Sequence, residues 1–186
     1  SPVTEVGVRN GVAYVGVGVT NTGINSSAIY QYDSANDSWS ILTNIPTLRV
    51  EAFTGIIGDK MVFIGGEKET GVADNTTEIY DFVTKTWTTG KSMPTARFLG
   101  GRMIHGENIY AVGGLDEMLY SVSKNEVYNI VDNTWKEDIP LLYAGNSLSS
   151  EYTDKYGYII GGIEIQYAMI NGRVQIYEFS QEDSSF

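Results

Sequence analysis

The sequence repeats at an interval of 48 residues, and this period constrains the fold more than any single motif. Three residue types keep it: glycine pairs at Gly65-Gly66, Gly113-Gly114 and Gly161-Gly162, tryptophan at Trp39, Trp87 and Trp135, and tyrosine at Tyr32, Tyr80, Tyr128 and, one residue late, Tyr177. A fixed period of this length indicates units of one structure that pack against their neighbours. We divide the 186-residue chain into units 1–48, 49–96, 97–144 and a shorter last unit, 145–186.

Each unit has the pattern of short strands and no useful helical period. In the second unit the strand-like runs cover 53–57, 61–65, 77–82 and 86–89, with turn residues between them. The glycine pair at the end of the second run allows a positive φ or the close approach of another backbone. The repeated Tyr and Trp offer large packing surfaces. An Asp or Asn after each of the first three repeat tyrosines is suited to cap a tight turn. Four antiparallel strands per unit are expected.

These units resemble the kelch repeat of β-propellers. The resemblance rests on Val-Phe-Ile-Gly-Gly at 62–66 with Ile-Tyr-Asp at 79–81 and Trp87, and on Tyr-Ala-Val-Gly-Gly at 110–114 with Val-Tyr-Asn at 127–129 and Trp135. It covers essentially the whole chain and implies an all-β propeller of four-stranded antiparallel blades. The first unit departs from it with Val17-Gly18 in place of the glycine pair. The last unit has Gly145 where the two middle units have arginine, and it lacks a tryptophan strand.

Four units, the last one short, are expected to form part of a larger ring. A propeller covers both faces of every blade, whereas an open arc leaves the aromatic faces of its end blades exposed. One uncovered Trp and Tyr forgo roughly 300–500 Å² of buried surface. We therefore expect the remaining blades of the same propeller, or a second copy of the chain, among the partners.

Composition and charge exclude several functions. With 12 Lys and Arg against 23 Asp and Glu, the net charge of −11 argues against a nucleic-acid partner. No run of apolar residues is long enough for membrane insertion. The absence of cysteine excludes a thiolate nucleophile and a cysteine zinc site, and leaves the cellular compartment open.

No cofactor or metal is expected. The galactose-oxidase branch of kelch propellers uses a cysteine-modified tyrosine and paired histidines at copper, and this chain has no cysteine and one histidine. That residue, His105, is expected to be a solvated turn residue. The acidic residues Glu67, Glu69 and Asp74 lack an ordered ligand pattern.

Two arginines are candidate ligand-binding residues. Arg49 and Arg97 end the related segments Ile-Pro-Thr-Leu-Arg and Met-Pro-Thr-Ala-Arg. In an up-and-down blade, such segments emerge on the same face as the loops between the second and third strands. The resemblance to kelch substrate adaptors implies that both arginines bind acidic peptide segments. The alternative is a structural role, in which they pair with carboxylates such as Glu78 or Glu126.

The loops between the second and third strands differ from unit to unit, as suits a recognition surface. In units three and four they are apolar, and they supply the candidate contact residues Met118, Leu119, Tyr120, Ile165, Tyr167 and Met169. Adjacent exposed apolar loops indicate a contact site. The alternative is that Ile163 to Ile170 forms a hairpin that packs on its own domain.

We interpret the chain as a non-catalytic module that binds a protein or peptide through this loop face. The alternative is a carbohydrate-binding or sugar-acid-modifying propeller, similar to the mutarotases of kelch type, that acts at the channel mouth. Arg, Glu and Tyr around one small pocket would favour the alternative, whereas a flat apolar patch would favour the protein partner. Fold alone does not decide between them.

Overall fold

A computed structural model describes residues 3–18, 26–167, 169–170 and 172–179 of the chain, which form four antiparallel sheets in sequence order. The first sheet consists of β1 (Val3–Arg9), β2 (Val12–Val17), β3 (Ala28–Asp33) and β4 (Ser38–Asn44). The second consists of β6 (Phe53–Ile57), β7 (Lys60–Ile64), β9 (Thr77–Asp81) and β10 (Thr86–Gly90). The third consists of β11 (Gly101–His105), β12 (Asn108–Val112), β13 (Asn125–Asn129) and β14 (Thr134–Glu137). The fourth has three described strands, β15 (Ser149–Tyr152), β16 (Tyr156–Ile160) and β19 (Val174–Glu178).

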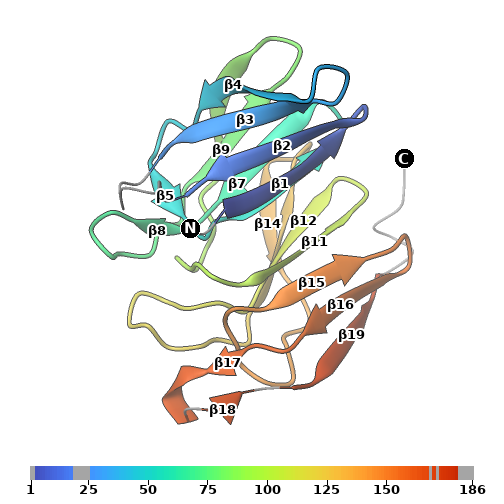
Figure 1. The fold of residues 1–186 in the computed structure, drawn as a ribbon. Helices are drawn as coiled ribbons and strands as arrows, with labels where there is room; N and C mark the ends of the chain where they lie inside the picture. The colour runs from blue at the N-terminus through green and yellow to red at the C-terminus, as the bar shows by residue number, and fades with distance from the viewer. Residues whose placement is uncertain (1–2, 19–25, 168, 171, 180–186) are drawn as a thin grey trace.

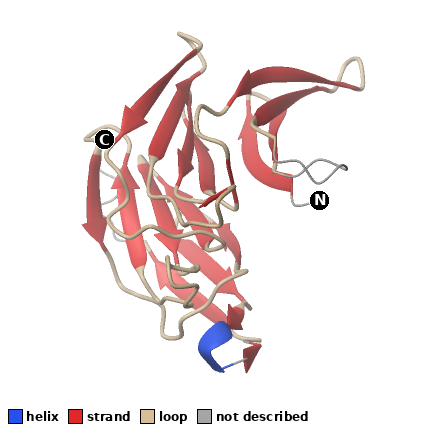
Figure 2. Cartoon of the chain, turned by 90° about the vertical axis from the view of Figure 1, so that its left-hand side faces the viewer, coloured by secondary structure: helices blue, strands red, loops and turns tan. Residues whose placement is uncertain are grey.

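Each sheet is a blade whose neighbouring strands follow one another in the sequence. The first strands of successive blades contact each other, β1 with β6, β6 with β11 and β11 with β15. Figure 1 shows the blades following one another from the blue first sheet to the orange-red fourth sheet, and Figure 2 shows the same strands from the side. The protein is thus all-β, with four blades in a propeller arrangement, which confirms the predicted fold class.

The strands of the second blade lie where the sequence pattern places them, within one residue at each end. Two short pairs lie outside the blades; the first was not predicted, whereas a hairpin from Ile163 to Ile170 was expected as an alternative for the second. They are β5 (Arg49–Val50) with β8 (Glu67–Lys68), and β17 (Ile163–Glu164) with β18 (Met169–Ile170), the latter joined by the 3-10 helix η1 (Ile165–Tyr167). In the part of the chain that the structure describes, no helix has the length and apolar character to cross a membrane.

The described residues form four apolar core clusters, of which three lie between blades and a smaller fourth consists of Ala73, Phe98 and Leu115. Blades 1 and 2 enclose Val6, Tyr14, Ile29, Ile45, Met61, Phe63 and Tyr80. Blades 2 and 3 enclose Phe53, Val62, Ile64, Ile79, Met93, Ile109, Ala111, Tyr128 and Ile130. Blades 3 and 4 enclose Met103, Tyr110, Val112, Val127, Ile159 and Phe179. Alternate residues of one strand therefore serve two different interfaces, as the period of two along a strand requires.

The repeat Tyr and Trp of a blade face the preceding blade. Tyr80 and Trp87 lie with their rings 5.3 Å apart, and the Trp87 indole donates to Thr43 Oγ1 at 3.0 Å. Trp135 in turn donates to the Lys91 carbonyl at 2.8 Å. Trp39 of the first blade pairs with Tyr32 but is 52% exposed, because no described blade precedes it. The expectation that a further segment covers this face stays a prediction.

The glycine pairs are the places where one blade's backbone meets the next. Gly65 and Gly113 have φ of 61° and 62°, in the left-handed region that favours glycine. The second glycine of each pair donates from its amide to the next blade, Gly66 to Arg97 O at 2.9 Å and Gly114 to Gly145 O at 2.7 Å. Both roles predicted for the glycine pair, positive φ and close backbone approach, are confirmed.

Candidate functional site

One face of the arc collects the loops between second and third strands. In blade 2, β8 of this loop pairs with β5, which places Lys68 opposite Arg49. Equivalent bridges join Phe98 to Leu115 in blade 3 and Asn146 to Ile163 in blade 4. Each loop is therefore tied to the segment that enters its own blade. We call this side the loop face.

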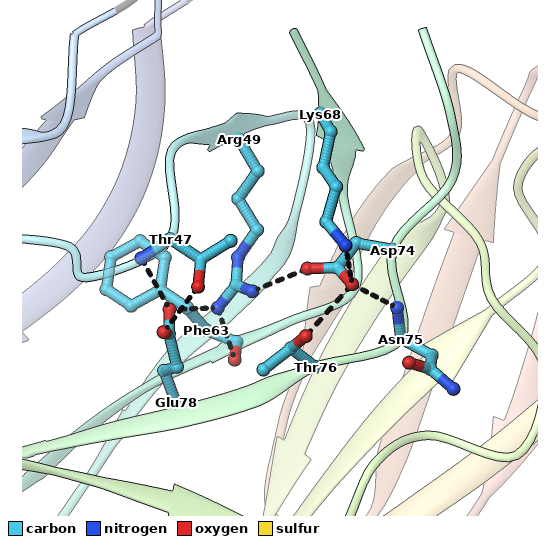
Figure 3. Close-up of polar contacts among 8 residues, drawn as sticks. All are labelled: Thr47, Arg49, Phe63, Lys68, Asp74, Asn75, Thr76 and Glu78. Atoms are coloured by element: carbon cyan, nitrogen blue, oxygen red, sulfur yellow. Dashed lines mark hydrogen bonds and ion pairs between the residues drawn. The ribbon is translucent and has the colours of Figure 1, made fainter. Parts of the chain in front are cut away.

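Arg49 lies inside this face rather than on it. Its guanidinium is buried and donates to Asp74 Oδ2 at 2.9 Å, to Glu78 Oε2 at 2.7 Å and to the Phe63 carbonyl at 3.3 Å. Figure 3 shows the two carboxylates approaching the guanidinium from different sides. Such charge-assisted bonds from a planar donor fix both partners.

Asp74, one of the two carboxylates bound to Arg49, also accepts hydrogen bonds from other residues. Its Oδ1 accepts from Thr76 Oγ1 and from the Asn75 amide, both at 2.9 Å, and lies 3.0 Å from Lys68 Nζ (Figure 3). Burial alone would raise the pKa of Asp74, but the hydrogen bonds from Lys68, Thr76 and Arg49 outweigh it and the pKa is lowered. Asp74 is therefore held as a carboxylate.

Arg97 repeats the arrangement one blade further with different partners. It donates to Glu126 Oε2 at 2.7 Å and to the carbonyls of Gly113, Ala111 and Lys124 at 2.7, 3.1 and 3.2 Å. Its side chain is fully buried, and this burial lowers the pKa of Arg97 against the opposing effect of Glu126.

Both arginines thus form the ion pairs with Glu78 and Glu126 that were expected as the structural alternative. Thr47 and Thr95 each donate to the second carboxylate oxygen of the paired glutamate at 2.8 Å. The described contacts surround both guanidinium groups with protein atoms. The contact of both arginines with an acidic peptide segment stays a prediction.

The loop of blade 3 presents three apolar side chains to solvent. The Asp116 carboxylate accepts from the amides of Met118 and Tyr120 at 2.9 Å each, and the Asp116 carbonyl accepts from the Leu119 amide at 3.0 Å. Leu119 takes a positive φ of 61°, which an L-residue rarely adopts. Met118 is 75% exposed, and Leu119 and Tyr120 are about half exposed.

The loop of blade 4 is the hairpin of β17, η1 and β18. Ile165 and Met169 are about half exposed, and Ile170 is 86% exposed, so the hairpin does not bury these side chains against its own domain. Tyr167 ends η1, and its side chain lies outside the described residues. Figure 2 shows η1 in blue at the bottom of the view, away from both chain termini.

Ser121 and Gln166 join the two loops. The Gln166 amide group donates to the Ser121 carbonyl at 2.8 Å, and its oxygen accepts from the Ser121 amide at 3.2 Å. The Ser121 hydroxyl accepts from the Ile165 amide at 3.1 Å and from Asn146 Nδ2 at 2.9 Å. The structure therefore brings the predicted contact residues of both loops to one side. We name Met118, Leu119, Tyr120, Ile165, Met169 and Ile170 the apolar loop patch.

A cavity of about 490 Å³ lies along the first strands of the four blades. It is lined by residues of β1, β6, β11 and β15, and by Gly100 and Leu148 from the segments before β11 and β15. Arg102, Glu151 and Tyr152 line it together with Ser149 and Ser150. Sequence reasoning did not single out these residues, because β15 does not follow the repeat motifs closely.

His105 is not the solvated turn residue that was predicted. It ends β11 and is partly buried. Its ring stacks on Phe179, with the ring centroids 4.4 Å apart and an angle of 4° between the ring planes. The stacking partner comes from the fourth blade, so the repeat pattern around His105 gave no sign of it. Within the described ranges, no three His, Asp or Glu side chains gather as a metal site.

Comparisons with known proteins agree with this architecture. The kelch motif model matches residues 48–94 and 103–137. The solved structure of YjhT superimposes with a TM-score of 0.74 at 14% identity, covering 96% of this chain and 65% of the YjhT chain. No match was found among curated proteins.

Two of the chain's units therefore match the kelch motif, and its four blades have a propeller arrangement. At 14% identity the likeness to YjhT concerns the fold. The chain spans about two thirds of the YjhT structure that it matches.

Proposed function

We propose that the chain is a recognition module that binds a protein or peptide through the apolar loop patch. The observation that carries this proposal is the exposure of six large apolar side chains on two loops that hydrogen bonds hold together. Exposed apolar surface of this kind marks interaction sites. The alternative, in which the hairpin packs on its own domain, would have buried Ile170.

Hydrogen bonds connect the described parts of the two loops. Asp116 accepts from the turn that carries Met118 to Tyr120, and the Ser121–Gln166 pair joins the hairpin to this loop. We expect these bonds to lower the entropy cost of ordering the loops on binding.

Acidic residues accompany the patch. Asp116 and Glu117 precede Met118, and Glu164 precedes Ile165, in a chain with a net charge of −11. We expect a partner with apolar side chains for the patch and basic residues beside them, because complementary charge speeds association and fixes orientation.

Changing Met118 and Ile170 together to serine should weaken binding through the apolar loop patch. Each substitution removes an apolar contact worth about 1.5–3 kcal/mol when fully buried, so a loss of at least about tenfold in affinity is expected. A photo-crosslinking residue at Leu119 would recover the partner, and its affinity for each variant would then be measured by calorimetry.

The matched control is the pair Val83→Ser and Val131→Ser. These valines are 69% and 65% exposed and lie in turns on the opposite side of blades 2 and 3. If both pairs of substitutions weaken binding equally, or neither does, the patch is not the binding surface.

The cavity along the first strands supports a second candidate function, the binding of a carbohydrate or sugar acid. Arg102, Glu151 and Tyr152 around one cavity are the grouping that favours this alternative. Glucuronate titrated to about 10 mM should shift the amide resonances of Ser149 to Tyr152 if this candidate is correct. Arg102→Ala should remove these shifts and leave binding at the apolar loop patch unchanged; an absence of shifts would exclude this candidate.

A further inference from the structure

The five methionines of the chain divide into two groups by their exposure. Met61, Met93 and Met103 are fully buried, each at 0% exposure, whereas Met118 is 75% and Met169 is 56% exposed. Both exposed methionines belong to the apolar loop patch, one on each of its two loops. The two thioethers that a reagent in solution can reach therefore lie on one surface.

The buried methionines are packed into the core between blades. Met61 belongs to the cluster of the first interface, Met93 to that of the second and Met103 to that of the third. The Met93 sulfur accepts a hydrogen bond from Arg97 Nη2 at 3.7 Å, and a Cβ added at Gly157 would collide with the Met103 sulfur. Because these sulfurs are enclosed by close-packed atoms, an oxidant reaches them only when the protein opens.

The two exposed methionines can be modified without disturbing the core. The Met118 amide donates to Asp116 Oδ1 at 2.9 Å, so the backbone fixes the residue while its side chain lies toward solvent. Met169 lies in β18, opposite Glu164 of the neighbouring β17. An oxygen atom added to either sulfur therefore meets water rather than packed side chains.

The composition of the chain directs a peroxide to its methionines. Thiolates are the side chains that react most readily with peroxides, and the sequence has no cysteine. Thioethers come next, and their oxidation follows exposure to solvent. Met118 and Met169 are therefore the expected sites of oxidation in the folded chain.

Oxidation changes the chemical character of the apolar loop patch. A thioether is apolar and polarizable, whereas a sulfoxide is polar and carries an oxygen that accepts hydrogen bonds. Met118 and Met169 are two of the six residues of the patch, so both of its loops would change. A partner that covers the patch would then have to bury two polar groups, which is unfavourable without hydrogen-bond donors for them.

We propose that Met118 and Met169 form a reversible oxidation site, through which hydrogen peroxide makes the apolar loop patch polar and weakens its contact with an apolar partner. The weaker contact with a partner rests on the function proposed above. The oxidation itself rests on the exposure of the two sulfurs.

The chemical step balances with hydrogen peroxide as the oxidant. The methionine sulfur attacks one peroxide oxygen, so that an S–O bond forms and the O–O bond breaks. The sulfur gives up two electrons, and the leaving hydroxide takes the proton of the transferred oxygen to become water. A methionine sulfoxide reductase reverses the change with a dithiol, which becomes a disulfide while the oxygen leaves as water.

Peptide mass spectrometry of the whole chain after treatment with hydrogen peroxide tests the selectivity. Met118 and Met169 should be oxidised at least about tenfold faster than Met61, Met93 and Met103, because the buried sulfurs react only when the fold opens. The chain should gain about 32 Da, one oxygen for each exposed methionine. Methionine sulfoxide reductases A and B, which act on the two sulfoxide epimers, should together restore the mass. Equal rates at all five methionines would overturn the proposal.

Retention on a phenyl-agarose column measures the polarity of the patch, with the phenyl group as the apolar probe. The oxidised chain should elute earlier than the untreated chain, and treatment with the two reductases should restore the retention. The matched control is Met118→Leu with Met169→Leu, which keeps apolar side chains of similar volume but removes both exposed sulfurs. Peroxide should not change the retention of this variant, and circular dichroism should show that both chains stay folded.

Two results on the column would overturn the proposal: an equal shift for the wild-type chain and the leucine variant, or no shift in a chain oxidised at both methionines. Failure of the proposed function gives a different result. In that case Met118→Ser with Ile170→Ser would leave partner binding unchanged, while the mass and retention results would stand. If this serine pair weakens binding and oxidation does not, the function stands and the effect of oxidation on binding is refuted.

Discussion

Replacing Arg97 with methionine should lower the free energy of unfolding by about 3–5 kcal/mol, because it leaves the buried Glu126 carboxylate without its partner. The Arg97 side chain is fully buried and bonds Glu126 at 2.7 Å. It also donates to the backbone carbonyls of Ala111 in β12 and of Gly113 and Lys124 after it, so its loss would leave these acceptors without this donor. Urea unfolding followed by tryptophan fluorescence would measure the change.

Two comparisons make this result specific. Lys155→Met breaks an ion pair with Glu178 in which both side chains are more than half exposed, and it should leave the free energy of unfolding nearly unchanged because solvent screens the pair. Changing Arg97 and Glu126 together to apolar residues should cost less than the sum of the single changes, because neither charge is then left alone. Equal effects of Arg97→Met and Lys155→Met would contradict the buried-pair account.

The difference between the two arginines explains why we choose Arg97. Arg49 has two carboxylates, Asp74 and Glu78, and Lys68 also pairs with Asp74. Removal of Arg49 therefore leaves Asp74 with another cation, whereas among the described residues the second cation near Glu126 is the more distant Lys124, at 3.9 Å. Repeated residues at one position of the repeat can thus differ in what they stabilise.

The repeat predicted the blades because each repeated residue meets the same surroundings. Gly65 and Gly113 meet a backbone carbonyl of the next blade, and Trp87 and Trp135 lie against the preceding one. The strand bounds followed from the apolar runs between turns. This part of the structure is local or strictly periodic, and a single sequence carries that information.

The candidate site was predicted less completely. The sequence indicated the apolar loops but not the Ser121–Gln166 pair that joins them, since the two residues come from different blades and neither belongs to the repeat. It named Glu78 and Glu126 as possible partners of the arginines, but whether a guanidinium turns inward depends on packing. For the same reason the stacking of Phe179 on His105 was missed.

Changing Gly113 to alanine is expected to destabilise the protein by about 2–5 kcal/mol, from about 1–2 kcal/mol for a left-handed residue and about 1–3 kcal/mol for overpacking. A Cβ at this position would lie 2.6 Å from the Gly145 carbonyl oxygen and 2.7 Å from Leu148 Cδ1. The Leu148 side chain can move. The carbonyl cannot do so freely, because it accepts the Gly114 amide that joins blade 3 to blade 4.

Gly58→Ala separates the two contributions. Gly58 has nearly the same φ, 56°, but a Cβ there meets nothing within 4 Å. Its substitution should therefore cost only the strain of a left-handed backbone conformation in alanine, about 1–2 kcal/mol. The additional loss of stability in Gly113→Ala measures the cost of the close contact between blades 3 and 4. It should be accompanied by faster hydrogen exchange at the amides of Gly114 and Asn146. If the two alanine variants are equally stable, the glycine pair matters only for its φ, and the seam between blades tolerates a methyl group.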